Sequence, residues 1–303
     1  MDKNRRFKFV INPVAGRGKT RGVDSLLDRL LREKNISYHI EITSKAFDAV
    51  RIAHEAAKTF DVVVSVGGDG TANEVANGVI GTKATLGVLP AGSGNDFAKV
   101  LGMKDSVEDS VHQLINGPTK RIDSGTVKVE DQASNGSSRR FVNSVGIGFD
   151  AIVAYEAQRI KHLKGIPLYL LSIVRSLQKL KPHPFQASFD GKQEIEDYTL
   201  VCVGNGNREG GGFFVTPGAD PSDGVFQVCT VKRVALLRAL RILPTILKGE
   251  HRRFAEVKFF DSKSVKLEST KPFVVHCDGE ILGVESSRVE VEIDPDSLSV
   301  VHG

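Results

Sequence analysis

A buried strand that runs into a glycine-rich turn is the feature that most restricts how this chain can fold. Residues 62–66 read Val-Val-Val-Ser-Val, an almost continuous β-branched run typical of a strand covered on both faces. Gly67-Gly68-Asp69-Gly70-Thr71 follows directly, and a helical apolar pattern covers 72–79. A strand buried on both faces needs helices above and below it, so this segment predicts an α/β domain.

The first 125 residues repeat this alternation of strand and helix. Strand patterns at 7–11, 36–42, 62–66 and 85–89 alternate with helical stripes at 23–31, 46–59 and 72–79. Strands separated by helices predict a parallel sheet, so we expect a Rossmann-like, three-layer α/β domain over residues 1–125.

The second half of the chain has a different pattern, with short strand candidates that follow one another. They lie at 140–145, 185–189, 199–203, 225–231, 264–268, 273–277 and 289–293. The pattern predicts an antiparallel, β-rich, sandwich-like domain over residues 126–294. We expect residues 295–303 to pack back on the first domain.

Composition narrows the functional classes. The 303 residues carry a net charge of +4, which suits a nucleotide or an anionic membrane surface and is too small to favour nucleic acid. Cys202, Cys229 and Cys277 are far apart and lack the spacing of a zinc site, so free thiols in a reducing cytoplasm are expected. Neither a signal peptide nor an apolar run near the ~20 residues of a membrane-spanning helix is evident.

The glycine-rich turn at 67–71 carries the strongest chemical signal. Its glycines let the backbone approach a ligand closely, and its amides at a helix N-terminus predict a phosphate site. Asp69 alone would repel phosphate, so it indicates Mg²⁺ between carboxylate and phosphate. A tight turn with Asp69 as a helix N-cap is the competing interpretation, and it explains the glycines but not the acid.

Two other phosphate-binding patterns are incomplete. Gly18-Lys19-Thr20 resembles the end of a P-loop, but the pattern needs glycine where Pro13 stands. Gly16 and Gly18 could begin a dinucleotide fingerprint, which Arg21 does not complete. The sequence therefore predicts neither a P-loop NTPase nor an ordinary Rossmann dehydrogenase.

Five motifs occur in a recognisable order along nearly the whole chain. They are Asn12-Pro13-Val14-Ala15-Gly16, Gly67–Thr71, Pro90–Ala98, Arg121-Ile122-Asp123 and Asp278-Gly279-Glu280. With them the chain resembles the diacylglycerol kinase catalytic-domain family, especially its soluble bacterial members, which are related to sphingosine kinases and more distantly to NAD kinases. The turn at 67–71 is shared with NAD kinases and phosphofructokinases, whereas the Gly-Ser-Gly-Asn-Asp-Phe-Ala motif is more specific to lipid kinases.

The resemblance implies a role for each matched position. The implied ATP site comprises Asn12, Pro13, Val14, Ala15, Gly16, Thr43, Gly67, Gly68, Asp69, Gly70, Thr71, Ala72, Asn73 and Ser93. Asp69, Asp96 and Asp123 resemble the water-bridged acidic network around the catalytic Mg²⁺. Glu280 resembles the general base that takes the proton from the lipid hydroxyl, with Asp278 beside it.

The residues by themselves leave the Asp-Gly-Glu motif open. Asp-Gly is a favoured two-residue hairpin turn, so a plain hairpin would account for it. Phosphoryl transfer, however, needs a proton acceptor, and a tight turn after the apolar run at 273–275 could present Glu280 in a cleft.

A second metal site is implied by the segment 220–225, Asp-Pro-Ser-Asp-Gly-Val. It resembles a loop that holds a structural Mg²⁺ in bacterial members of the family. The implied ligands are the Asp223 side chain and the carbonyls of Asp220 and Val225, which suit a hard, oxygen-seeking cation. A simple β-turn is the competing interpretation.

Two basic stretches, 154–181 and 234–248, combine cationic and apolar residues. Such stretches can lie on anionic bilayers, but we expect most of their apolar residues to pack on the β-rich domain and a minority near the cleft to touch lipid. The glycine-rich run at 204–212 is expected to be a mobile loop.

These observations lead to one hypothesis, an ATP-dependent lipid kinase that uses Mg²⁺, with diacylglycerol as the acceptor and phosphatidic acid as the product. The alternatives are another lipid acceptor (a sphingoid base, ceramide or another glycerolipid), an NAD kinase, or a non-catalytic nucleotide or lipid sensor. The expected partners are ATP, the lipid and, transiently, the membrane surface from the cytoplasm, and no nucleic acid. A homodimer is one assembly considered, although no residue pattern selects it.

Overall fold

The protein is described from a computed structural model. The structure describes residues 5–303 apart from Lys19, Arg21, Asn135, Lys161 and Lys164. The apparent P-loop end at Lys19 and two lysines of the first basic stretch, Lys161 and Lys164, therefore lie outside the described residues. The chain divides into two compact units. Unit 1 comprises Met1–Ile122 with Asp296–Gly303, and unit 2 comprises Asp123–Pro295.

Unit 1 is built on short parallel strands joined through helices. Its strands are β1 (Arg6–Ile11), β2 (Ser37–Ile42), β3 (Val62–Gly67) and β4 (Thr85–Pro90), and its helices are α1 (Val23–Glu33), α2 (Asp48–Ala56), α3 (Asp69–Val79), α4 (Asp96–Val100) and α5 (Val107–Asn116). The strand order is β4-β3-β1-β2, and each neighbouring pair is parallel. The end of β13 (Glu280–Val301) adds a parallel contact at Val300–Leu86.

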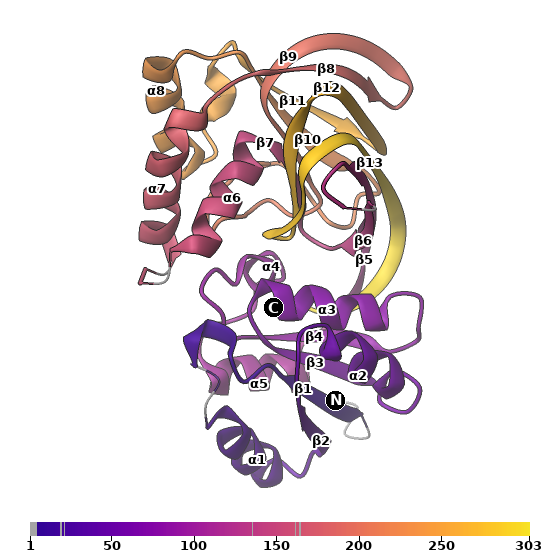
Figure 1. The fold of residues 1–303 in the computed structure, drawn as a ribbon. Coiled ribbons are helices and arrows are strands. Elements are labelled where there is room, and N and C mark those ends of the chain that lie inside the picture. The colour runs from indigo at the N-terminus through magenta and orange to yellow at the C-terminus, as the bar shows by residue number, and fades with distance from the viewer. Residues whose placement is uncertain (1–4, 19, 21, 135, 161, 164) are drawn as a thin grey trace. The chain divides into compact units, whose positions relative to one another are not determined.

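The burial pattern explains the layers of unit 1. All six residues of β3 are buried, as the β-branched run predicts for a strand covered on both faces. Figure 1 shows α1 and α5 together on one side of this sheet and α2 with α3 on the other. Helix α3 begins at Asp69, three residues before the apolar pattern indicated, so the acid and Thr71 belong to its first turn.

Unit 2 is β-rich and its strand pairs are antiparallel. Its strands are β5 (Thr119–Asp131, which begins in unit 1), β6 (Ser137–Phe141), β7 (Ser144–Gly148), β8 (His183–Phe189), β9 (Lys192–Gly204), β10 (Phe226–Lys232), β11 (Val257–Ser262), β12 (Ser264–Cys277) and most of β13, and its helices are α6 (Phe149–Arg159), α7 (Gly165–Ser176) and α8 (Leu236–Ile246). The order β11-β10-β9-β7-β12-β13 forms the main sheet. A core of buried side chains from these strands, including Phe141, Phe185, Phe226 and Phe273, holds the unit together.

Four strand predictions in unit 2 need correction. The run 140–145 is two strands, because β6 ends at Phe141 and β7 begins at Ser144. The candidates 264–268 and 273–277 belong to one strand, β12, whose pairing with β13 is irregular between Glu268 and Phe273. A register shift carries the strand through the polar residues between the two candidates. The candidate 289–293 is part of a strand of 22 residues.

Two further findings bear on the sequence-based expectations. Cys202, Cys229 and Cys277 are free and buried, and burial raises the pKa of each thiol above its ordinary value. None of the helices in the described part of the chain combines the length and apolarity needed to cross a bilayer.

Gly78 tests the tight packing of α3 on α2. A Cβ at this position would lie 2.6 Å from the Cβ of Ala53 and 2.6 Å from the carbonyl oxygen of Val50. Replacing a helical glycine with alanine usually stabilises a helix by about 0.5–1 kcal/mol. Here we expect Gly78→Ala to destabilise the protein by roughly 1–3 kcal/mol, because the helices must move apart.

Urea denaturation of the full chain measures the effect. The control is Arg29→Ala on the exposed face of α1, which should change the free energy of unfolding by less than about 0.5 kcal/mol. A stabilised Gly78→Ala protein would show that the α2–α3 approach is not as close as described.

Candidate active site

A group of candidate site residues lies in unit 1, where the chain changes direction across the sheet. The connection from β1 leads outward to β2, and the next connection leads back to β3 on the other side of β1. In open α/β sheets, ligands bind at such switch points, outside the carboxyl ends of the strands. Asn12, directly after β1, donates from its side-chain amide to the hydroxyl of Thr71 at 3.1 Å and so spans this point.

The ends of β3 and β4 approach each other closely at two glycines. A Cβ on Gly92 would lie 2.3 Å from the Cα of Gly68, so residue 92 cannot carry a side chain, and a Cβ on Gly68 would lie only 3.1 Å from the Cα of Gly92. The Ala91 amide donates to the Gly67 carbonyl at 2.8 Å, and the Gly92 amide donates to the Asn95 side chain at 2.8 Å. Backbone, not side chains, therefore forms this part of the site.

Two carboxylates of unit 1 lie beside this glycine contact. Asp69 accepts a hydrogen bond from the Phe97 amide at 3.0 Å, which ties the first turn of α3 to the first turn of α4. Asp96 is buried, with the Lys99 ammonium 3.7 Å from it. Ser93 is exposed on the intervening loop.

The remaining predicted nucleotide residues lie at the same sheet edge. The Val14 amide donates to the Asn12 side chain at 3.1 Å, which shapes the turn through Pro13, Ala15 and Gly16. The Thr43 amide donates to the Ile11 carbonyl at 2.8 Å. The Ser44 amide, together with Arg51 and the Ser44 hydroxyl, lowers the pKa of Asp48 to about 2 and fixes the chain just after β2.

A separate group of candidate site residues lies in unit 2, at the hairpin between β12 and β13. Asp278 and Gly279 both have positive φ (47° and 81°), and Cys277 pairs with Glu280 across them, so the motif is a two-residue hairpin turn. The Asp278 carboxylate is nearly buried and accepts the amides of Val142, Asn143 and Ser144 at 3.1, 3.0 and 2.9 Å. These bonds also explain why β6 and β7 are separate strands.

Glu280 emerges from this turn beside an arginine. Its carboxylate contacts Arg139 of β6 at 2.5 Å, and the Arg139 side chain is 14% exposed while that of Glu280 is 37% exposed. Although burial of Arg139 opposes its ionisation, Glu280 raises the pKa of the guanidinium above its ordinary value. The pair therefore holds the Glu280 carboxylate beside a guanidinium while leaving it reachable by solvent.

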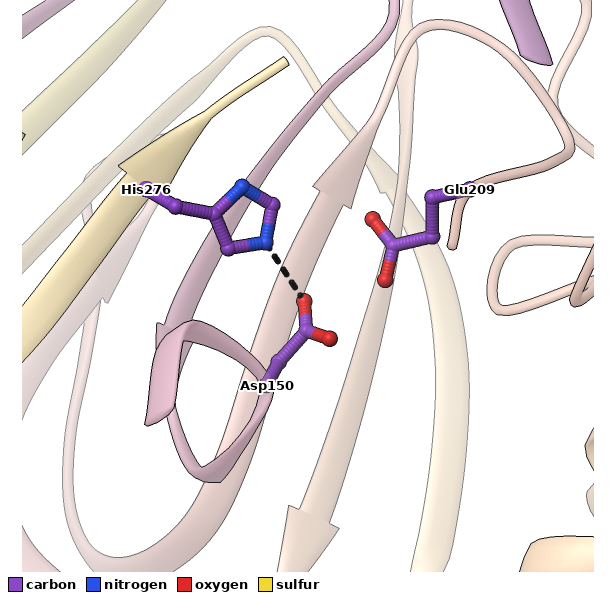
Figure 2. A group of neighbouring side chains, drawn as sticks. All are labelled: Asp150, Glu209 and His276. Atoms are coloured by element: carbon purple, nitrogen blue, oxygen red, sulfur yellow. Dashed lines mark hydrogen bonds and ion pairs between the residues drawn. The ribbon is translucent and has the colours of Figure 1, made fainter. Parts of the chain in front are cut away.

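Figure 2 shows a second polar cluster, made by Asp150 in the first turn of α6, Glu209 after β9, and His276 in β12. His276 Nε2 lies 3.1 Å from an Asp150 oxygen, and the Ser144 hydroxyl donates to Glu209 at 2.8 Å. Gly146 makes room for the pair, because a Cβ there would lie 2.1 Å from Asp150 and 2.2 Å from His276.

The ligand atoms of this cluster lie within 4.8 Å of one another, which is a spacing that a metal ion could bridge. Both ring nitrogens of His276, however, already take part in hydrogen bonds. The Gly279 amide donates to His276 Nδ1 at 3.4 Å, so in the neutral ring Nε2 carries the hydrogen and donates it to Asp150. The cluster therefore braces the Asp278–Gly279 turn.

The segment 220–225 lies against Asp123, the third acid of the implied network. The Gly224 amide donates to the Asp123 carboxylate at 2.8 Å, and the Asp123 amide donates to the Pro221 carbonyl at 2.6 Å. Burial, and then the carboxylates of Asp220, Asp123 and Asp261, raise the pKa of Asp223 despite a hydrogen bond from the Val225 amide. Crowded carboxylates of this kind favour a bound cation.

Several functional candidates carry no recognisable signal in the sequence. Arg139 lies 141 positions from Glu280, and Asp150 lies 126 positions from His276, so only the fold pairs them. The glycine-rich run at 204–212 was expected to be mobile. Its buried Asn205 instead donates to the carbonyls of Asp123 and Val142 at 2.9 and 2.8 Å.

Comparisons with known proteins agree on one family. Residues 6–127 match the diacylglycerol kinase catalytic domain, and residues 143–302 match the YegS C-terminal NAD kinase beta sandwich-like domain. A diacylglycerol kinase of Mycobacterium tuberculosis is 32% identical over 274 residues, which cover 89% of this chain and 86% of the relative. A diacylglycerol kinase of Bacillus subtilis is 29% identical over 285 residues, which cover 92% and 91%.

Solved structures show the same fold at lower identity. A diacylglycerol kinase structure from Bacillus anthracis has a TM-score of 0.73 at 20% identity and covers 99% of this chain and 97% of that one. Yeast NADH kinase in complex with NADH has a TM-score of 0.52 at 10% identity, with 99% and 84% covered. The chain has the two-domain fold of these kinases, with a β-rich C-terminal part.

The sequence matches place this chain in a class of phosphotransferases with a separate catalytic domain and β-rich domain. The chain belongs to the diacylglycerol kinase family, and it is an enzyme of that type.

The three amides on Asp278 predict a large stability effect. In Asp278→Asn one carboxylate oxygen becomes an NH₂ group, which faces a backbone N–H and leaves a buried donor unsatisfied. We expect a loss of roughly 2–3 kcal/mol in the free energy of unfolding, measured by urea denaturation.

Asp190 provides a matched control. It occupies an equivalent Asp-Gly turn with φ of 49°, but it is exposed, and a single carboxylate oxygen accepts the amides of Lys263 and Ser264. Asp190→Asn can keep that acceptor and should lose less than about 1 kcal/mol. If the two variants lost the same free energy of unfolding, the three amide hydrogen bonds to Asp278 would not have the large stabilising effect expected of them.

Proposed function

We propose that this protein transfers the γ-phosphate of ATP to a lipid hydroxyl, with diacylglycerol as the acceptor and phosphatidic acid as the product. The observation that carries the proposal is the sheet edge at the switch point of unit 1. There the N-terminus of α3 and the close pair Gly68 and Gly92 leave backbone, without side chains, where phosphate groups would bind.

Unit 1 is the proposed nucleotide-binding part, corresponding to residues 1–125 of the sequence. Asn12, Thr43 and Ser93, with the turn 13–16 and the first turn of α3 through Asn73, would orient the nucleotide. The amide and hydroxyl donors of this edge suit the phosphate oxygens, and the glycines let those oxygens approach the backbone.

Unit 2 is the proposed lipid-binding part, corresponding to residues 126–294. Glu280 would accept the proton of the acceptor hydroxyl while that oxygen attacks the γ-phosphorus. Arg139 would hold the Glu280 carboxylate in place before the acceptor binds, through their ion pair. Asp278 would position the base, because its own oxygens are occupied by backbone amides.

Magnesium fits the donor set of the acidic residues. Asp69, Asp96 and Asp123 would hold the catalytic Mg²⁺, and the Asp223 side chain with the carbonyls of Asp220 and Val225 would hold a structural one. Burial, and then the neighbouring carboxylates, raise the pKa of Asp223, and a bound cation would offset both effects. When bound, Mg²⁺ neutralises charge on the phosphates.

An activity assay tests the proposal directly. MgATP carrying a labelled γ-phosphate is mixed with diacylglycerol, sphingosine, ceramide or NAD. We expect label on diacylglycerol. Glu280→Gln and Asp69→Asn should lower kcat by roughly 10²–10⁴-fold, because each removes a group that acts in the transfer step.

Each other outcome assigns a different function. Label on another lipid would change the acceptor but keep the kinase, and label on NAD would replace the lipid acceptor altogether. Full activity of Glu280→Gln would show that another group accepts the proton. The control Asp190→Asn, in the exposed matched turn, should retain wild-type kcat.

The raised pKa of Asp223, in the segment 220–225, predicts that Mg²⁺ stabilises the folded protein at neutral pH. A carboxyl whose pKa is raised on folding destabilises the folded protein above its pKa, and the penalty disappears as pH falls below the unfolded value of about 3.9. At pH 7 the penalty from Asp223 is therefore fully present, and Mg²⁺ should offset it. We expect millimolar Mg²⁺ to raise Tm by roughly 2–4 °C.

Two variants distinguish the loss of a Mg²⁺ ligand from the relief of repulsion between carboxylates. Asp223→Asn should raise Tm without metal and lose the Mg²⁺-dependent increase that this loop contributes. Asp261→Asn relieves the same repulsion without removing a proposed ligand, so it should keep the full increase. An Asp223→Asn protein whose Tm responds to Mg²⁺ like the wild type would exclude the loop as a metal site.

A further inference from the structure

Helices α7 and α8 carry an unusual number of exposed apolar side chains. On α7, Ile166, Leu170 and Val174 are 42%, 46% and 60% exposed and follow one another at intervals of four residues, on one helix face. On α8, Leu236, Leu237 and Leu240 are 48%, 76% and 45% exposed. We call these six residues the apolar face.

The apolar face is concentrated, not scattered. Among the described residues of unit 2, the large exposed hydrophobic side chains outside it are Ile195 and Val284. Single exposed apolar residues are normal on any protein, but a cluster marks a surface that is covered in function.

The two helices present this face on the same side of unit 2. Their inner faces pack on one hydrophobic cluster, to which α7 contributes Tyr169 and Ile173 and α8 contributes Ile242 and Ile246. Figure 1 shows α7 and α8 along the same side of the β-rich unit. Because their inner faces share this cluster, their outer faces are exposed side by side.

Charge indicates what covers this surface. Neither helix contains an aspartate or a glutamate, and Arg175 and Arg241 are exposed next to the apolar residues. Arg238 is paired with Glu256 through two hydrogen bonds, so it adds no unpaired charge to this surface. The exposed Lys248 follows the end of α8 and extends the basic rim.

We propose that the apolar face inserts into the headgroup boundary of an anionic lipid bilayer, with Arg175, Arg241 and Lys248 on the lipid phosphates. Apolar side chains beside cations and without acids are what an anionic interface accommodates. A second copy of this chain would bring the same cations together, which disfavours self-association. This inference rests on the proposed function and names the surface through which the enzyme would reach a lipid in a membrane.

Vesicle binding tests the surface independently of catalysis. Sedimentation with vesicles of phosphatidylcholine and about a third phosphatidylglycerol should show binding of the wild type that Leu170→Glu/Leu237→Glu weakens by roughly tenfold or more. Arg175→Gln/Arg241→Gln should weaken binding to these vesicles and flatten its dependence on salt. Ile195→Glu, at an exposed site on β9, is the control and should bind like the wild type.

Activity on two forms of the acceptor completes the test. On diacylglycerol within vesicles, Leu170→Glu/Leu237→Glu should lose activity in proportion to its lost binding. On water-soluble dihexanoylglycerol, it should keep wild-type activity to within about twofold, which also shows that it is folded. Equal loss on both forms, or unchanged vesicle binding, would overturn the surface.

Two further outcomes are distinct from these. A wild type that phosphorylates neither form refutes the proposed acceptor, while vesicle binding still tests the surface. A wild-type dimer that the leucine variant converts to monomer, with vesicle affinity unchanged, would assign the apolar face to a second copy and overturn the proposal.

Discussion

The carboxylate of Asp278 is the interaction on which the geometry of unit 2 depends. A nearly buried charge is costly unless it is hydrogen-bonded, and this one accepts three consecutive backbone amides. The same three amides would otherwise continue one strand. Their hydrogen bonds to Asp278 therefore separate β6 from β7 and join the bend between these strands to the β12–β13 turn. On the other side of that turn, Gly279 donates to His276, which is held in turn by Asp150. Glu280 therefore projects from a turn that is fixed from two sides, which is the rigidity that a proton acceptor needs.

In unit 1 the geometry is fixed by a close contact between two backbone segments at residues without side chains. Gly68 and Gly92 bring two strand ends within backbone contact, and any Cβ on Gly92 would push them apart. The polar side chains around this contact form hydrogen bonds with the backbone and with one another, as Asn12 does with Thr71 across the switch point. The result is a phosphate-type edge made of amides and hydroxyls. Its one nearby acid in the first turn of α3, Asp69, is oriented by the Phe97 amide.

Much of this could be anticipated from local patterns. The β-branched run at 62–66 predicted a strand buried on both faces, and the Asp-Gly pair at 278–279 predicted a two-residue hairpin, because both depend on neighbouring residues alone. The broken strand at 140–145 could not be anticipated, since its cause is a carboxylate more than 130 positions away. The outer faces of α7 and α8 were equally ambiguous. A helix that is apolar on several sides does not reveal which side the core leaves uncovered.

The sequence by itself determined the order of strands and helices, the glycine-rich turns and the family, because periodicity and short motifs are properties of adjacent residues. Tertiary structure alone decided which charges meet. Arg139 reaches Glu280, and Asp150 reaches His276, only because antiparallel strands return the chain to its earlier segments. An ion pair or a hydrogen bond acts over a few ångströms of space and is indifferent to separation along the chain, so no local pattern records it.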